Sequence, residues 1–184
     1  MNATREAWRA LACYVVGPWR HARDGHIWLR ATGDGFATPA LDDGSRLLVR
    51  GDQLVLEPDR TSAITTVRAA AEFAGLELSA HPPVGTDLPR FDPDRLLEID
   101  PESASTTAEW WALGAEVLAT MGEPRLWPEH FDIAITVDGV NIGFSPGDGD
   151  HDEPYVYVGP HDVAFPRPRR SVLECTVRGV APTP

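Results

Sequence analysis

The dipeptide Asp138-Gly139 separates two runs of alternating apolar and polar residues, and it constrains the fold more than any other stretch of the chain. Residues 131–137 and 140–144 place a large apolar side chain at every second position, which is the period of a β-strand with one buried face. Both residues of a tight hairpin turn need positive φ, and Asp-Gly accepts this readily. The sequence therefore predicts an antiparallel hairpin.

A two-residue turn also fixes which residues face each other. Its register makes three apolar pairs: Val137 with Val140, Ile135 with Ile142 and Ile133 with Phe144. These side chains then share one face, as a correct register requires, while Asp132 lies opposite Ser145 on the other face. Residues 145–154 follow as a loop rich in Pro and Gly, and residues 155–158 alternate again as a third strand.

Three further segments show the helical spacing of apolar residues together with end signals. These helices are predicted at 4–16, ended by Gly17-Pro18, at 67–74, between a threonine cap and Gly75, and at 106–121, after a capping box of Thr106 and Glu109. The predicted core stripe of the last helix consists of Trp110, Leu113, Val117 and Met121. Strands are also predicted at 26–30, 36–38, 47–49, 54–56 and 171–178.

Strands in consecutive hairpins pair antiparallel, so the predicted class is α+β, an antiparallel sheet with about three helices packed on it. The length suits a single domain over 1–184. Residues 4–78 and 100–178 each contain a helix followed by a strand and a Gly/Asp turn, and the Pro-rich connector 79–99 joins them. A duplication of α-plus-hairpin halves is therefore an open alternative.

The formal net charge is −12, and the chain contains no lysine. Nucleic acid and anionic membranes are not expected as partners, because both are bound by neutralising negative charge. The missing lysine excludes a Walker-A phosphate loop and a Schiff-base lysine. No apolar run reaches the roughly 20 residues of a membrane helix, no signal peptide is evident, and Cys13 and Cys175 match no metal or redox spacing. A cytoplasmic protein is expected.

The loop after the hairpin holds the densest cluster of charged residues. Its candidates for a divalent metal site are Asp148, Asp150, His151, Asp152 and Glu153. The run begins like an EF-hand loop, but Glu153 stands where that loop needs Gly, and Gly159 where it needs Glu. A looser calcium or magnesium site is one interpretation. The other is an acidic turn neutralised by Arg167, Arg169 or Arg170.

Three other constellations carry chemistry. A transition-metal site can be assembled from His130, Asp132, His151 and His161. A nucleophilic site can be assembled from Ser145, His130 and Asp132, although no G-x-S-x-G motif is present. An apolar pocket can be lined by Trp127, Tyr155, Tyr157, Trp110 and Trp111, which fit a hydrophobic core equally well.

Two segments carry a family resemblance: Leu126-Trp127-Pro128-Glu129-His130-Phe131-Asp132, and Phe144-Ser145-Pro146-Gly147-Asp148 followed by Glu153-Pro154-Tyr155-Val156-Tyr157. They resemble a bacterial family known only as domain of unknown function 5996, with its Leu-Trp-Pro-x-His-Phe-Asp, Pro-Gly-Asp and Glu-Pro-Tyr-x-Tyr pattern. The resemblance implies an α+β domain and assigns no activity. The positions it points to are Trp127, His130, Asp132, Pro146, Gly147, Asp148, Glu153, Pro154 and Tyr155.

The expected function is binding of a small ligand or a protein partner, without a recognisable catalytic motif. The candidate binding residues are Trp127, His130, Asp132, Ser145, Tyr155 and Tyr157. One alternative is a metal-dependent enzyme, hydrolytic, that uses His130, Asp132 and the acidic loop 148–153. Another is a structural or oligomeric scaffold. The sequence identifies no cofactor, with a divalent metal as the open alternative, and it assigns no catalytic residue or oligomeric state.

Overall fold

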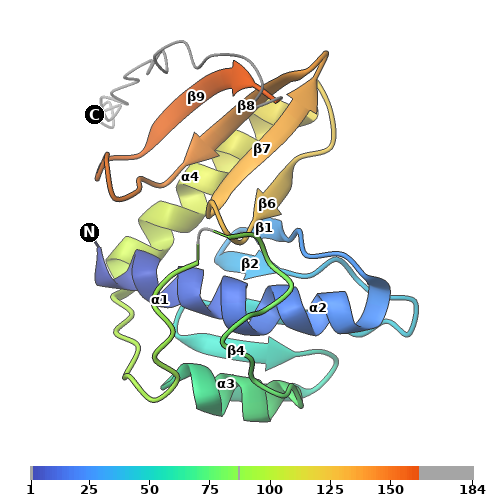
Figure 1. The fold of residues 1–184 in the computed structure, drawn as a ribbon, viewed down its shortest axis with the longest axis vertical. Helices are drawn as coiled ribbons and strands as arrows, with labels where there is room; N and C mark the ends of the chain where they lie inside the picture. Colours follow the sequence, from blue (N-terminus) through green and yellow to red (C-terminus); the bar gives the residue numbers. More distant parts are fainter. Residues whose placement is uncertain (1, 87, 162–184) are drawn as a thin grey trace, which may run out of the picture.

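The computed structural model describes residues 2–86 and 88–161 and shows two antiparallel sheets with helices packed against them (Figure 1). The five-stranded sheet contains β1 (Arg30–Thr32), β2 (Gly35–Ala37), β3 (Leu47–Arg50), β4 (Gln53–Leu56) and β5 (Arg60–Ala63), in that order. The four-stranded sheet contains β6 (Arg125–Trp127), β7 (Asp132–Val137), β8 (Val140–Ser145) and β9 (Tyr155–Pro160). The predicted α+β class is confirmed.

The central hairpin forms in the predicted register. Val137 pairs with Val140, Ile135 with Ile142 and Ile133 with Phe144. Asp138 and Gly139 both have positive φ, 49° and 77°, as the tight turn requires. The second predicted hairpin also forms, between β3 and β4. The strand predicted at 155–158 is β9, which runs on to Pro160.

The first helix does not end at Gly17-Pro18, so this prediction was wrong. Helix α1 (Ala3–Leu11) continues through a π-helical turn, η1 (Ala12–Val16), into α2 (Gly17–Asp24). In the wider turn the Gly17 N–H bonds to the carbonyl of Ala12, and the chain passes Pro18 without a break. The helix ends at Gly25, whose φ of 78° is left-handed.

Helix α4 (Pro101–Ala119) starts directly after Asp100, five residues before the predicted capping box at Thr106. Asp100 is its N-cap and accepts the Ser103 N–H at 2.8 Å, with proline at the first helical position. Thr106 lies within the helix and donates to the carbonyl of Glu102. Helix α3 (Val67–Ala74) matches its prediction, between a Thr66 cap and a left-handed Gly75.

The predicted core stripe of α4 was wrong for three of its four residues, whereas Trp110 packs against the core. Leu113, Val117 and Met121 are exposed, and the buried residues of α4 are Ala104, Thr107, Ala108, Trp111, Gly114 and Leu118. The mostly small buried face lets the helix lie close to the sheet. At Gly114 an added Cβ would lie only 2.8 Å from the Phe144 ring.

Short strands account for the remaining differences. The predicted strand 26–30 is shifted to β1, and β5 and β6 were not predicted. The predicted strand 171–178, with Cys175, lies outside the described residues, as do Arg167, Arg169 and Arg170.

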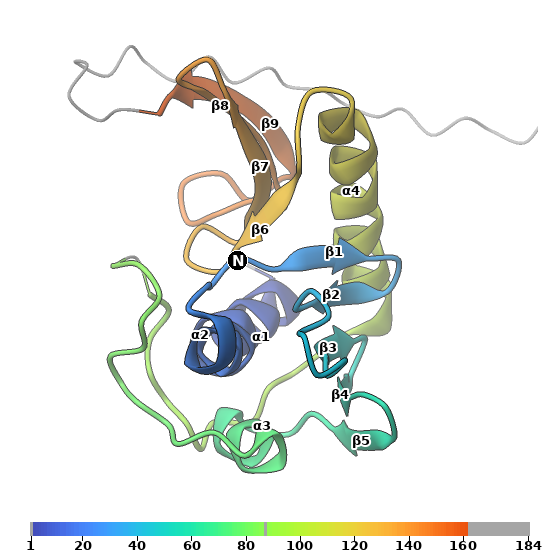
Figure 2. The ribbon, with the colours of Figure 1, turned by 90° about the vertical axis from the view of Figure 1, so that its right-hand side faces the viewer.

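A cluster of four aromatic rings joins the two sheets. Trp8 of α1 stacks on Trp111 of α4 at 6.0 Å, and Phe36 of β2 and Phe131 pack edge-on against Trp111 at 6.1 and 4.8 Å. Helix α4 contacts strands of both sheets (Figure 2). The buried apolar side chains of both sheets therefore belong to one core. No helix within the described residues combines the length and apolar character needed to cross a bilayer.

Candidate functional site

The candidate site lies on the face of the four-stranded sheet that points away from α4. Helix α4 covers the face that carries Ile133 and Phe144. Because side chains alternate along a strand, Asp132 lies on the opposite face. Its pairing partner on β6 is Trp127, and the pairing of β8 with β9 places Tyr157 on the same side. Five of the six predicted binding residues thus share this face: Trp127, Asp132, Ser145, Tyr155 and Tyr157.

Asp132 is the most unusual residue of the site. Its side chain is 4% exposed, and its Oδ2 accepts a hydrogen bond from the Tyr157 hydroxyl. Its Oδ1 is buried and has no hydrogen-bond partner among the residues that the structure describes. Burial raises the pKa of the Asp132 carboxyl above its ordinary value, and the Tyr157 bond and the charge of nearby His130 only partly offset this.

A glycine lets Tyr157 reach across the sheet. Gly143 of β8 lies between β7 and β9 and pairs with Tyr157. A Cβ at this position would lie 2.5 Å from three atoms of the tyrosine ring and hydroxyl. The ring therefore occupies the space that any other side chain would fill. The sequence alone does not show why position 143 is a glycine. The register of β8 with β9 shows it, because it places Gly143 beside Tyr157.

Ser145 and His130 do not form a nucleophilic relay with Asp132. The Ser145 hydroxyl oxygen accepts the N–H of Gly147 at 3.2 Å, and the side chain is buried. His130 is exposed. No hydrogen bond links His130 to Ser145 or to Asp132 in the described part of the chain, although a general base must contact the nucleophile that it activates.

The acidic loop is held by an arginine that the sequence analysis missed. Arg5 of α1 is buried, and its Nη1 donates to the carbonyls of Pro146 at 3.0 Å and Asp152 at 2.9 Å. Its Nη2 lies 3.2 Å from Oδ1 of Asp152, and this bond lowers the pKa of that carboxyl. Gly147, with φ of 101°, has no room for a Cβ because Arg5 and the Asp152 carbonyl lie against it. The available signal was position: Arg5 lies on the buried face of α1, three residues before Trp8.

The other carboxylates of the loop are engaged within it. Asp148 accepts the N–H groups of Asp150 and His151, at 2.9 and 2.8 Å, and the Tyr155 hydroxyl at 2.5 Å. Asp150 and Glu153 are exposed. Residues 2–86 and 88–161 contain no group of three or more His, Cys, Asp or Glu side chains that could hold a metal ion. The structure therefore does not gather the two predicted metal sets, and it pairs His161 with Asn141 at 3.2 Å.

The five predicted pocket aromatics are divided between the two faces of the sheet. Trp110 packs on Phe144 at 5.4 Å, on the α4 side, and Trp111 belongs to the buried aromatic cluster. Tyr155 and Tyr157 lie 6.3 Å apart on the Asp132 side, where Trp127 is half-buried. The tryptophans of α4 are core residues, whereas the tyrosines belong to the candidate site.

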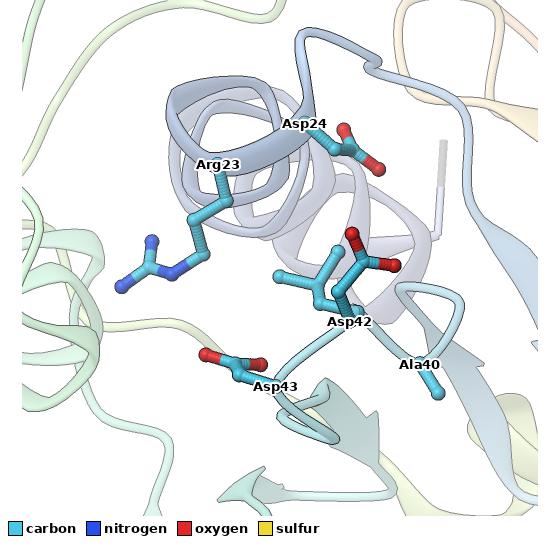
Figure 3. A pocket seen from close by; sticks show the side chains of 6 residues that line it. Arg23, Asp24, Ala40, Asp42 and Asp43 are labelled. Carbon is cyan, nitrogen blue, oxygen red and sulfur yellow. The ribbon is translucent and has the colours of Figure 1, made fainter.

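An open cavity of about 330 Å³ lies elsewhere, between the end of α2 and the 40–43 turn (Figure 3). Its charged lining residues are Arg23, Asp24, Asp42 and Asp43. Arg23 stacks on the Trp19 ring at 3.7 Å. Asp24 accepts from Arg20 at 2.9 Å, and Asp43 accepts both the N–H and the hydroxyl of Ser45. Three of the four charged residues thus have a partner within the chain.

Comparisons of the chain with models of protein families, with curated proteins and with solved structures found no match. The resemblance of residues 126–132 and 144–157 to domain of unknown function 5996 stays a prediction. A functional conclusion therefore depends on the geometry around Asp132.

Proposed function

We propose that the chain is a cytoplasmic α+β domain that binds a small molecule on the sheet face that carries Asp132 and Tyr157. The observation behind this proposal is the buried Asp132 Oδ1, which has no hydrogen-bond partner among the described residues. Buried polar atoms are nearly always hydrogen-bonded in folded proteins, and leaving one unsatisfied costs about 1–3 kcal/mol. A ligand that donates an N–H or O–H to Oδ1 removes that cost.

The surroundings of Asp132 favour a cationic donor. Three aromatic side chains, Trp127, Tyr155 and Tyr157, share its face of the sheet, and aromatic rings attract cations as well as apolar groups. The chain carries a net charge of −12, which attracts cations from solution. A buried carboxyl also gains more from pairing with a cation than an exposed one. The expected ligand is a small amine or guanidinium compound with an apolar part.

A thermal-denaturation screen tests this proposal. Benzylamine, agmatine, benzamide and benzyl alcohol represent the amine, guanidinium, amide and hydroxyl donors. A ligand at a hundred times its Kd stabilises the folded state by about 2.7 kcal/mol, and we expect the two cations to raise the melting temperature. Asp132→Asn should abolish the rise. Thr136→Val, which alters an exposed side chain on the same face, should keep it.

Two results would count against the proposal. One is an equal rise in melting temperature for the wild-type protein and Asp132→Asn, which would place binding elsewhere. The other is no rise with any of the four compounds at millimolar concentration. In the second case a carboxyl chemical-shift titration of Asp132 by NMR, with and without benzylamine, must also show no change.

A further inference from the structure

Five large apolar side chains are exposed on the side of the molecule opposite the candidate site. We call Leu113 and Val117 of α4, Met121 just after the end of α4, Val140 of β8 and Val158 of β9 the α4 apolar surface. Their exposed fractions are 42%, 42%, 45%, 36% and 44%. Single exposed apolar residues are common on soluble proteins, but grouped ones mark interaction sites.

Leu113 and Val117 form a stripe on α4, because they are four positions apart, and Met121 follows just after the helix ends at Ala119. The stripe lies on the side of α4 that faces β8. Trp110, three residues before Leu113 and seven before Val117, packs on Phe144 of β8 at 5.4 Å. The stripe therefore lies along the edge of α4 that is next to β8.

The two sheet residues lie on the same side as this stripe. Ile142 pairs with Val158, and Ile142, Phe144 and Val140 alternate along β8 on the face that α4 covers. Helix α4 contacts β7 and β8 but makes few contacts with β9. The exposed residues of the helix flank and those of the sheet therefore lie on the same side of the four-stranded sheet, the side on which α4 packs (Figure 2).

The charged residues that flank Leu113 and Val117 on α4 are acidic. Glu109 and Glu116 are exposed on α4, four residues before and three after Leu113, and Asp138 is exposed at the hairpin tip beside Val140. The sequence has no lysine or arginine between Arg95 and Arg125. Complementary charge at the rim of an interface directs association and selects the partner.

We propose that the α4 apolar surface binds an amphipathic helix of another protein, with arginine or lysine residues beside its apolar stripe. Helices bind in this way through apolar residues at i, i+3, i+4 and i+7. A second copy of this chain fits less well, because it would bring glutamates against glutamates. The chain's own residues 171–178 alternate with period two, which is a strand pattern and not a helical one.

The probe is a fluorescein-labelled synthetic peptide of about 18 residues, five helical turns, with Leu on one face and Arg elsewhere. Binding to the full chain is followed by fluorescence anisotropy. Val117→Glu disrupts the stripe, and Ala112→Glu, on an exposed and different side of α4, is its matched control. Both variants add the same negative charge. We expect Val117→Glu to weaken binding at least tenfold and Ala112→Glu to leave it unchanged or slightly tighter. A peptide with Glu in place of Arg, and one of scrambled order, should not bind.

Each alternative occupant has its own outcome, and each overturns the proposal. Equal affinity of Val117→Glu and Ala112→Glu means that the peptide binds by charge alone. Light scattering that shows a wild-type dimer, lost in Val117→Glu, means that a second copy occupies the surface. Binding that appears only after residues 162–184 are deleted means that the chain's own C-terminal segment occupies it. Circular dichroism of both variants verifies that they are folded.

Discussion

Replacing Arg5 by Met removes the cation that holds the 146–152 loop against α1 while keeping an unbranched side chain of similar reach. The change leaves the carbonyls of Pro146 and Asp152, bonded at 3.0 and 2.9 Å, without their donor. An unsatisfied buried acceptor costs about 1–3 kcal/mol, so two give about 2–6 kcal/mol before the loop relaxes. Because a loop can move and let water reach its carbonyls, we expect a loss of about 3 kcal/mol. The exposed carboxylate of Asp152 adds little.

Urea and thermal unfolding followed by circular dichroism measure this loss. For a chain of this length a loss of 1 kcal/mol lowers the melting temperature by about 2–4 °C, so Arg5→Met should lower it by about 6–12 °C. The control is Arg50→Met, which breaks a half-exposed ion pair with Asp34 at 2.8 Å and should cost about 0–1 kcal/mol. Amide hydrogen exchange should accelerate first at 146–152. A melting temperature no lower than that of Arg50→Met, or exchange that accelerates evenly along the chain, would refute the reasoning.

Three other substitutions test the packing and the charge of the four-stranded sheet. Gly114→Ala should lower the free energy of unfolding measured in urea, because the added Cβ would lie 2.8–2.9 Å from core side chains. Overpacking costs about 1–3 kcal/mol, against about 1 kcal/mol of helix propensity gained. Gly122→Ala is the control and should cost less, because the nearest neighbour of its Cβ would be 3.7 Å away. Gly143→Ala should displace the Tyr157 ring, and Tyr157→Phe removes its hydroxyl. Both changes should raise the pKa of Asp132 further in a carboxyl NMR titration, because the hydrogen bond from Tyr157 lowers that pKa. A pKa unchanged by both substitutions would contradict the hydrogen bond between Tyr157 and Asp132. Asp132 has a raised pKa in the folded protein, so the wild type should lose stability as the pH rises from the ordinary aspartate pKa through the raised one; melting curves of Asp132→Asn that run parallel to the wild type from pH 4 to 8 would exclude this.

The central hairpin could be predicted because its signals are local. Asp138-Gly139 determines the turn, and alternation on both sides allows only one register with a single apolar face. The same holds for α3, where a threonine cap and a left-handed glycine are eight residues apart. In these segments the information needed lies within a few residues of the element itself.

Helix α4 shows where local information fails. Its sequence is apolar on more than one side, so the helical spacing of Trp110, Leu113, Val117 and Met121 suggested the buried stripe, although the last three are exposed. The packing partner selects a smaller surface instead, because Gly114 lets the helix approach Phe144 closely. The Gly17-Pro18 stop failed for a similar reason. Burial of residues 11–20 on all sides favours a continuous helix, and one π-helical turn accommodates the proline.

The candidate site was only half predictable for the same physical reason. Asp132 and Tyr157 are 25 positions apart, and alternation places both on one face once the register is known. Arg5 lies 141 positions before Pro146, and no local pattern relates a helix near one terminus to a loop near the other. Long-range polar contacts of this kind depend on how the sheets and helices pack together.

The two proposed binding surfaces lie on opposite faces of the same four strands, and this makes a further prediction about their independence. Substitutions at distant sites with no shared contact have additive effects, so Val117→Glu should not alter the response to benzylamine, and Asp132→Asn should not alter peptide affinity. Strands β8 and β9 carry residues of both surfaces, and in β8 Gly143 supports Tyr157 on one face while Phe144 packs under Trp110 on the other. If benzylamine changes peptide affinity in the wild type but not in Gly143→Ala, the two faces are coupled through this strand and additivity fails.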